Sequence, residues 1–133
     1  MSGQPTETIE LRTEDDIVVA RTAARELAST LEFSLIDKTR IATAITELAR
    51  NTLVHGGGGM ELRRRANGAG DGIHCVFVDQ GKGVPDIERA LGDSFTTSNG
   101  LGQGLPGSER LMDELIIESE PGKGTRVEVT KWK

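Results

Sequence analysis

The stretch DQGKGVP (residues 79–85) and, after a short acidic segment, FTTSNGLGQGLPG (residues 95–107) decide how the chain is interpreted. Both parts are rich in glycine, which weakens a packed core because it costs backbone entropy and offers no side chain. The first part opens with a carboxylate, Asp79, directly after an apolar run, and the second leads into an expected helix. A carboxylate suits the edge of a base, and free N–H groups at a helix start suit phosphates. The stretch therefore predicts a nucleotide site.

Two amphipathic helices are expected before this stretch. Thr13 is a good N-cap for the first helix, and the three acidic residues after it favour the helix dipole. Apolar residues recur at helical spacing over residues 17–31 and again over residues 41–52. The second helix is expected to run from about Asp37 to Val54, where four consecutive glycines stop it.

Runs of β-branched and alternating residues predict five strands. The expected strands are residues 8–11, 60–65, 73–78, 115–119 and 125–132, with a glycine-rich hairpin loop at 67–72 and short helices at 85–91 and 105–112. Two successive helices that each have one apolar face need a sheet to cover. The sequence therefore predicts a single domain over residues 1–133. Its expected fold class is a two-layer α/β (α+β) sandwich, in which helices cover one face of a mixed, mostly antiparallel sheet.

The composition argues against several classes of function. The net charge of −5 is unfavourable for a nucleic-acid partner, and the one basic run, Arg63 to Arg65, is interpreted as a solvated strand edge. The single cysteine, Cys75, excludes an internal disulfide and fits a reducing compartment. No apolar run reaches the roughly 20 residues of a membrane span, and residues 1–8 lack a signal-peptide pattern. A soluble, cytoplasmic protein without a membrane partner is expected.

The second expected helix carries Glu47 and Asn51 four residues apart, so both project from one face beside the apolar stripe. A carboxylate next to an amide oxygen suits Mg²⁺, which takes oxygen ligands and keeps several waters. The alternative is an exposed helical glutamate near an asparagine that begins to end the helix. Spacing alone leaves both interpretations open.

Asp79 ends an apolar, strand-like run, where a carboxylate is costly to bury unless it accepts hydrogen bonds. An adenine amine is a suitable donor. Gly81 and Gly83 let the backbone turn sharply and pass close to a planar ligand. An ordinary Asp-Gln-Gly turn is the alternative.

The glycines at 100, 102 and 104 precede an expected helix and could hold an anion. Residues 102–107 also spell G-x-G-x-x-G, but the polar loop before them does not match the strand that a dinucleotide-binding unit requires. A Walker A motif is absent as well, and two histidines with one cysteine are too few and too scattered for a convincing zinc site.

In this order, the three segments resemble the GHKL ATPase superfamily, which includes gyrase, Hsp90, histidine kinases and MutL. The segment ELARN (47–51) resembles the family's N box, DQGKG (79–83) its first glycine box and GLGQG (100–104) its second. Gly124 and Thr125 match the family position whose hydroxyl helps to hold adenine. Within the superfamily, TELARN (46–51) and GLPGSERLMDE (104–114) are most similar to the RsbT switch kinases, relatives of the RsbW and SpoIIAB anti-sigma-factor kinases.

The resemblance implies a Bergerat ATP-binding fold and an ATP- and Mg²⁺-dependent serine/threonine protein kinase. It implies Glu47 as the general base, Asn51 as the Mg²⁺ ligand, and Asp79 as the acceptor of the adenine amine with support from Thr125. The other expected ATP-binding residues are Gly81, Gly83, Gly100, Leu101, Gly102, Gly104 and Leu105, and Thr97 and Ser98 are expected to close over the phosphates.

The resemblance also implies protein partners. The expected substrates are STAS-domain scaffold proteins of the stressosome, and the released kinase is expected to activate a PP2C-type phosphatase in a partner-switching stress pathway. Two other functions remain open: an anti-sigma factor that sequesters a sigma factor, and a non-catalytic adaptor in which ATP orders residues 93–104. A pull-down would separate the first from a kinase, and labelled ATP with a STAS protein would separate the second.

Overall fold

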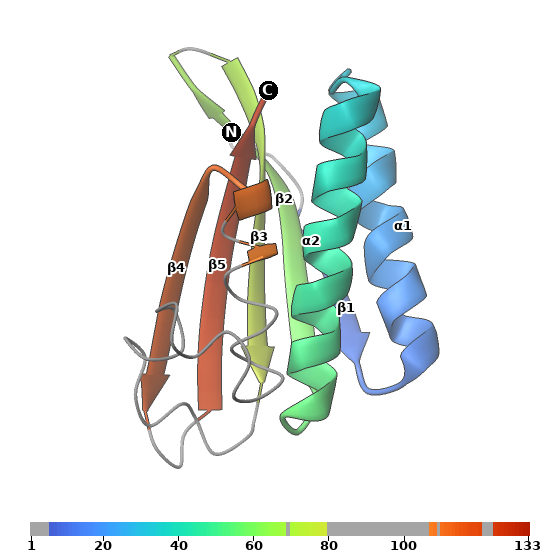
Figure 1. Ribbon diagram of the computed structural model, residues 1–133, viewed down its shortest axis with the longest axis vertical. Coiled ribbons are helices and arrows are strands. Elements are labelled where there is room, and N and C mark those ends of the chain that lie inside the picture. Colours follow the sequence, from blue (N-terminus) through green and yellow to red (C-terminus); the bar gives the residue numbers. More distant parts are fainter. Residues whose placement is uncertain (1–5, 69, 80–106, 109, 121–123) are drawn as a thin grey trace.

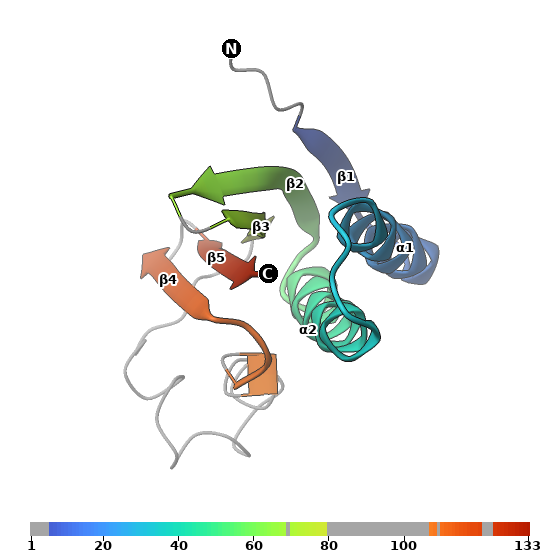
Figure 2. The same cartoon turned by 90° about the horizontal axis from the view of Figure 1, so that it is seen from above.

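A five-stranded sheet with two long helices on one face forms the protein, as seen in a computed structural model (Figures 1 and 2). The structure describes residues 6–68, 70–79, 107–108, 110–120 and 124–133. The elements in chain order are β1 (Glu7–Leu11), α1 (Glu14–Thr30), α2 (Leu35–Val54), β2 (Gly58–Asn67), β3 (Gly70–Asp79), β4 (Glu114–Glu120) and β5 (Gly124–Trp132). The strand order is β1-β2-β3-β5-β4, so the last strand in sequence lies between β3 and β4.

Each helix begins at a capped position. Thr13 and Asp16 form a capping box at α1: the Thr13 hydroxyl accepts from the Asp16 N–H at 3.3 Å, and the Asp16 carboxylate accepts from the Thr13 N–H at 3.0 Å. The Asp16 carboxylate also accepts from the Arg12 N–H at 2.8 Å, and this hydrogen bond is the main reason that the pKa of Asp16 lies below its ordinary value. Ser34 caps α2 through a single hydrogen bond, in which its hydroxyl accepts from the Asp37 N–H at 3.1 Å.

The core lies between the helices and the sheet. Strand β3 directs Ile73, Cys75 and Phe77 toward the helices, and the apolar stripe of α2 meets them. That stripe is the predicted one, since Ile41, Ala44, Ile45, Leu48 and Thr52 are all buried. Burial also raises the pKa of the Cys75 thiol far above its ordinary range. The predicted helix-covered sandwich is therefore confirmed.

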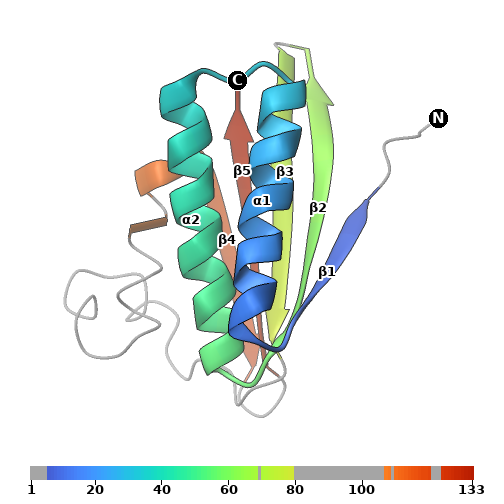
Figure 3. The same ribbon diagram turned by 90° about the vertical axis from the view of Figure 1, so that its right-hand side faces the viewer.

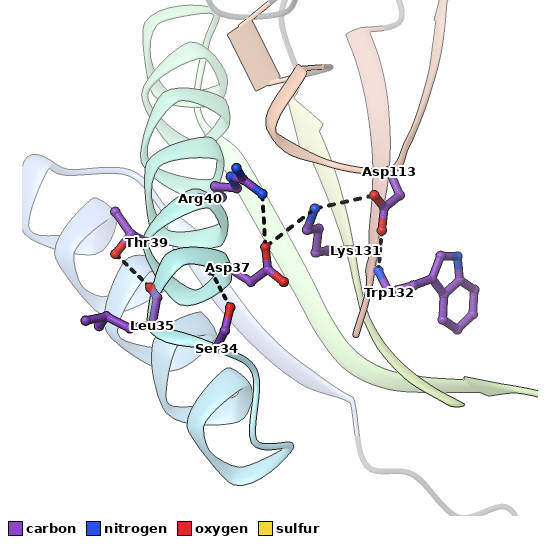
Figure 4. Close-up of polar contacts among 8 residues, drawn as sticks. All are labelled: Ser34, Leu35, Asp37, Thr39, Arg40, Asp113, Lys131 and Trp132. Atoms are coloured by element: carbon purple, nitrogen blue, oxygen red, sulfur yellow. Dashed lines mark hydrogen bonds and ion pairs between the residues drawn. The ribbon is translucent and has the colours of Figure 1, made fainter. Parts of the chain in front are cut away.

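Polar contacts join the start of α2 to the sheet (Figure 4). The Lys131 ammonium on β5 lies 3.9 Å from the Asp37 carboxylate and 3.4 Å from that of Asp113. Asp37 is also 3.3 Å from Arg40, and the second carboxylate oxygen of Asp113 accepts from the Trp132 N–H at 2.6 Å. Because Lys131 is largely buried, its charge is balanced by these carboxylates rather than by water.

No helix in the described part of the chain covers the other face of the sheet (Figure 2). On that face, polar side chains of β2, β3 and β5 contact one another. Arg63 Nε on β2 donates to His74 Nδ1 on β3 at 3.1 Å, and His74 Nε2 lies 2.5 Å from Glu128 Oε2 on β5. Since Nδ1 accepts, Nε2 carries the proton and donates to Glu128. That hydrogen bond is the main cause of the lowered pKa of Glu128, with a further contribution from Arg126. His74 therefore has a structural role, since it links β2, β3 and β5.

The sequence misplaced several element ends. Residues 67–72 were expected to be a loop, but β2 continues to Asn67 and β3 starts at Gly70. Gly58 and Gly59 were assigned to the helix stop, but they belong to β2, and only Gly56 and Gly57 turn the chain, both with positive φ. All four strand pairings among the described residues are antiparallel, so the parallel component implied by a mixed sheet is not found there.

Two other expectations receive partial tests. Residues 107, 108, 110 and 111 are helical, in agreement with the helix expected at 105–112, whereas the helix expected at 85–91 lies outside the described residues. No helical segment in the described ranges combines the length and the apolar character needed to cross a bilayer.

Candidate functional site

The last turns of α2 carry Glu47 and Asn51. The Glu47 carboxylate is about half exposed and lies 3.9 Å from the Arg50 guanidinium one turn away. Asn51 is partly buried, and its side-chain Nδ2 is shielded from solvent without a hydrogen-bond partner among the described residues. A buried amide usually has a partner, so an unpartnered one indicates a place where a polar ligand fits.

Asp79 is buried at the end of β3 and holds the start of β5. Its Oδ1 accepts from the backbone N–H of Thr125 at 3.2 Å. Gly124 makes this approach possible, because it has a φ of +92° and a Cβ atom there would lie 2.3 Å from the carbonyl oxygen of Asp79. The Thr125 hydroxyl lies 3.0 Å from that of Ser119 on β4. The Asp79 carboxylate therefore contacts β5 directly, and β5 is joined to β4 through Ser119.

A shallow open pocket of about 180 Å³ lies at these three strand ends, and its lining consists of Val78, Asp79, Glu118, Ser119, Gly124, Thr125 and Arg126. Its walls combine two carboxylates, a guanidinium, two hydroxyls, the apolar side chain of Val78 and a glycine. Such a lining can accept and donate hydrogen bonds to a flat polar group while a glycine leaves room for it.

The α2 pair and the β3–β5 pair lie at the same end of the molecule (Figures 1 and 3). Helix α2 and strand β3 both run toward that end, where α2 stops at Val54 and β3 stops at Asp79. The chain leaving α2 enters β2 at Gly58, which is the cross-strand partner of Asp79. Gly58 is tightly placed, because a Cβ atom there would lie 1.8 Å from the carbonyl oxygen of Val78.

The other predicted site residues belong to the part of the chain that the structure does not describe. Gly81, Gly83, Thr97, Ser98, Gly100, Leu101, Gly102, Gly104 and Leu105 lie outside the described residues. Of the predicted set, the structure locates Glu47, Asn51, Asp79 and Thr125. No group of three or more His, Cys, Asp or Glu side chains in the described ranges is arranged to hold a metal ion by itself.

Two residues near the site were not predicted from the sequence. Ser119 supports Thr125, and the expected hairpin of residues 115–119 and 125–132 already placed the two opposite each other, so the pairing was a usable signal. His55 caps the end of α2, and its Nε2 is buried without a hydrogen-bond partner among the described residues. In the sequence, the four-residue spacing from Asn51 was the only indication that His55 lies near Asn51.

The chain is similar to known proteins over most of its length. Residues 36–133 match the family described as histidine kinase-, DNA gyrase B- and HSP90-like ATPase. The chain is 44% identical over 125 residues to the serine/threonine-protein kinase RsbT of Bacillus subtilis, covering 93% of this chain and 94% of that protein. It is 36% identical over 118 residues to an anti-sigma F factor of Thermoanaerobacter, covering 85% and 82%.

Solved structures are similar in fold. A Mycobacterium tuberculosis structure containing RsbU and RsbW domains superimposes with a TM-score of 0.67 at 20% identity, over 98% of this chain and 32% of that one. The catalytic domain of the histidine kinase ThkA superimposes with a TM-score of 0.53 at 16% identity, over 96% of both chains. The present chain thus spans about a third of the first structure and nearly all of the second.

Proposed function

Because the chain belongs to the histidine kinase-, DNA gyrase B- and HSP90-like ATPase family, we propose that it is an ATP- and Mg²⁺-dependent serine/threonine kinase of STAS-domain proteins. The observation that supports the proposal is that the last turns of α2, which carry Glu47 and Asn51, lie at the same end of the molecule as the strand ends that carry Asp79 and Thr125 (Figures 1 and 3). We also propose that residues 1–133 act as one domain.

Adenine recognition is assigned to the strand ends. The buried carboxylate of Asp79 accepts from the adenine amine, and Thr125 supports the ring while Ser119 orients its hydroxyl. The backbone of Gly100 to Gly104 is assigned to the phosphate tail, and Gly81 and Gly83 to the close approach of the backbone to the planar base, both on the sequence argument alone.

The residues on α2 fit a magnesium–nucleotide complex. Asn51 offers an amide whose nitrogen has no described partner, and an amide oxygen beside a carboxylate is a donor set that suits a hard cation. Asn51 would hold Mg²⁺, which when bound neutralises charge on the phosphates. Protein groups in such reactions contribute mainly position and charge stabilisation.

Glu47 is assigned the role of general base. Its carboxylate is half exposed, so the hydroxyl of a protein substrate can reach it, and Arg50 restricts its position. Glu47 also lines a groove of about 370 Å³ between α1 and α2, together with Thr43, Thr46 and Arg25. This groove provides a path for a substrate segment to approach the carboxylate from the helix side.

The partners are inferred from the relationship to RsbT, a serine/threonine-protein kinase. STAS-domain stressosome proteins are the proposed substrates, and a PP2C-type phosphatase is the proposed partner of the released kinase. Cytoplasmic location follows from this role. The similarity to anti-sigma F factors supports a second candidate, in which the chain sequesters a sigma factor. A pull-down that retains a sigma factor, and neither a STAS protein nor a phosphatase, would favour the second candidate.

The test is transfer of labelled phosphate from ATP to a purified STAS protein, with Glu47→Gln as the variant. Since a general base contributes roughly 10²- to 10⁴-fold, transfer should fall by that factor while calorimetry reports unchanged ATP affinity. Glu61→Gln is the control, because Glu61 is exposed on β2 away from the site. Unimpaired transfer by Glu47→Gln would exclude the base assignment, and absence of transfer by the unaltered protein would exclude the kinase.

A further inference from the structure

One edge of the sheet is only partly paired. Strand β1 pairs with β2 from Gly58 to Leu62, beside the lower half of β2 in Figure 3. Beyond that point, Arg63 to Ala66 have a strand partner only in β3 among the residues that the structure describes. In an antiparallel sheet, alternate residues of an outer strand direct both N–H and C=O away from their neighbour. The upper half of β2 can therefore accept another extended chain.

A groove of about 550 Å³ runs beside this edge, between β2 and the second half of α1. Its lining includes the apolar side chains of Leu27, Leu31 and Leu62, and Glu26 and Arg64 are among its polar members. A strand added to the β2 edge would direct every second side chain toward the helix side, which is where this apolar lining lies. The groove thus suits alternate apolar side chains of the added strand.

The other face of the same edge is basic. Arg63 and Arg65 project onto the uncovered face, where Arg63 donates to His74 and Arg65 donates to Thr130 at 3.1 Å and lies 5.9 Å from the Trp132 ring centre. None of these partners is a carboxylate, whereas Arg64 is ion-paired with Asp71 at 2.6 Å. Arg63 and Arg65 therefore keep positive charges that a partner strand could balance.

We propose that the edge formed by residues 63–66 binds an extended segment of a partner protein, in which apolar residues alternate with Asp or Glu. The apolar residues occupy the groove, and the acidic residues lie opposite Arg63 and Arg65. A second copy of this edge is unsuited, because antiparallel self-pairing would bring arginines opposite arginines, and like charges across strands are destabilising. This surface is separate from the α2 and Asp79 site, so the proposal does not depend on the kinase assignment.

The probe is the peptide acetyl-EVEVEVE-amide, with KVKVKVK as its charge-reversed counterpart. Binding is followed by fluorescence anisotropy and by hydrogen exchange of the full chain. The acidic peptide should bind and slow exchange of backbone amides within residues 63–66. The double variant Arg63→Glu/Arg65→Glu should weaken it at least tenfold and gain affinity for the lysine peptide. Arg126→Glu, on the same face but on β5, should leave binding unchanged.

Backbone pairing has its own test. N-methylation of alternate peptide residues removes N–H groups from one side of the peptide, so one methylated register should lose binding and the other should keep it. The proposal would be overturned if the two methylated peptides bound equally well, or if hydrogen exchange at residues 63–66 were not slowed. It would also be overturned if the acidic peptide did not bind at millimolar concentration. A tenfold gain in peptide affinity on removing residues 1–5 would also overturn the proposal, because it would mean that the chain's own N-terminal residues occupy this edge.

Discussion

Asp79 has an observed contact with β5 and a proposed role in binding adenine, and a single substitution can separate the two. Asparagine keeps an oxygen that can accept from the Thr125 N–H, so the contact between β3 and β5 is retained. The charge is lost, however, and hydrogen bonds to charged groups are worth about 1.5–3 kcal/mol. Asp79→Asn should therefore lower the affinity for the ligand more than the stability of the fold.

Asp79→Asn should lower ATP affinity roughly tenfold to a hundredfold, in line with that energy. Titration calorimetry measures the ATP affinity, and a melting curve checks that the fold is retained. Asp71→Asn is the matched control, because Asp71 lies on the same strand at the opposite end. Unchanged affinity in Asp79→Asn would contradict the adenine assignment.

Gly124 is a second decisive position. Gly124→Ala should destabilise the protein by about 1–3 kcal/mol, because its φ is +92° and the added Cβ would meet the Asp79 carbonyl oxygen. ATP affinity should fall as well, since β5 must withdraw from Asp79. Urea denaturation and calorimetry report the two effects. Gly68→Ala serves as control, because a Cβ at Gly68 meets nothing within 4 Å; similar losses in both variants would refute the argument.

At the scale of an element, the first turn of α1 shows how a capping box couples a helix to pH. The pKa of Asp16 is lowered mainly by the hydrogen bond from the Arg12 N–H, with the Thr13 N–H contributing. A carboxylate with a lowered pKa stabilises the folded state above the unfolded value, 3.8, and this contribution is lost as the pH falls through the folded value.

Asp16→Asn should therefore reduce stability at pH 7 and have less effect near pH 3. Urea denaturation at the two pH values measures the difference. Asp15→Asn, in the same turn but outside the capping box, should not reproduce this dependence. An Asp16→Asn effect that is equally large at both pH values would show that the charge is not its origin.

At the scale of the whole molecule, the charged side chains on the uncovered face connect three strands. The pKa of Glu128 on β5 is lowered chiefly by its hydrogen bond with His74 on β3, which in turn accepts from Arg63 on β2. Glu128 thus adds stability above its ordinary pKa of 4.5, and this stability disappears as the pH falls through the lower folded value.

Glu128→Gln should melt at a lower temperature than the unaltered protein at pH 7, and the gap should narrow in acid below pH 4.5. Thermal denaturation over a series of pH values measures this difference in melting temperature. Glu118→Gln is the control, since Glu118 contacts the same Arg126 but is far more exposed. A difference in melting temperature that stays constant across the series would mean that the contact of the Glu128 carboxylate with His74 does not support the sheet.

Local signals in the sequence predicted the helices and most strands, because caps and apolar spacing act over a few residues. The strand ends were misjudged because Gly58 and Gly72 were interpreted as turn formers. In the structure, Gly58 is needed where Val78 passes close to it, and Gly72 lies under the Trp132 ring. Those are contacts between distant segments, which spacing does not reveal.

The placement of the candidate site residues was predictable to the same extent, whereas their roles stay predictions. The four-residue spacing of Glu47 and Asn51 placed them on one helix face, as found. The contact between Asp79 and Thr125 depends on β5 lying between β3 and β4, and the spacing of residues along the chain does not determine that strand order. The resemblance to a known family supplied Thr125, while Ser119 was missed because no motif includes it.

The position of Trp132, the only tryptophan in the chain, has a practical consequence. It lies opposite Gly72 at one end of β3, and Asp79 is at the other end, seven residues and about 24 Å away. Light emitted by this indole should thus report the collapse or loss of the sheet while staying insensitive to occupancy of the distant end. Folding could then be followed by tryptophan fluorescence and ligand binding by a separate dye in the same sample, because neither signal would depend on the other.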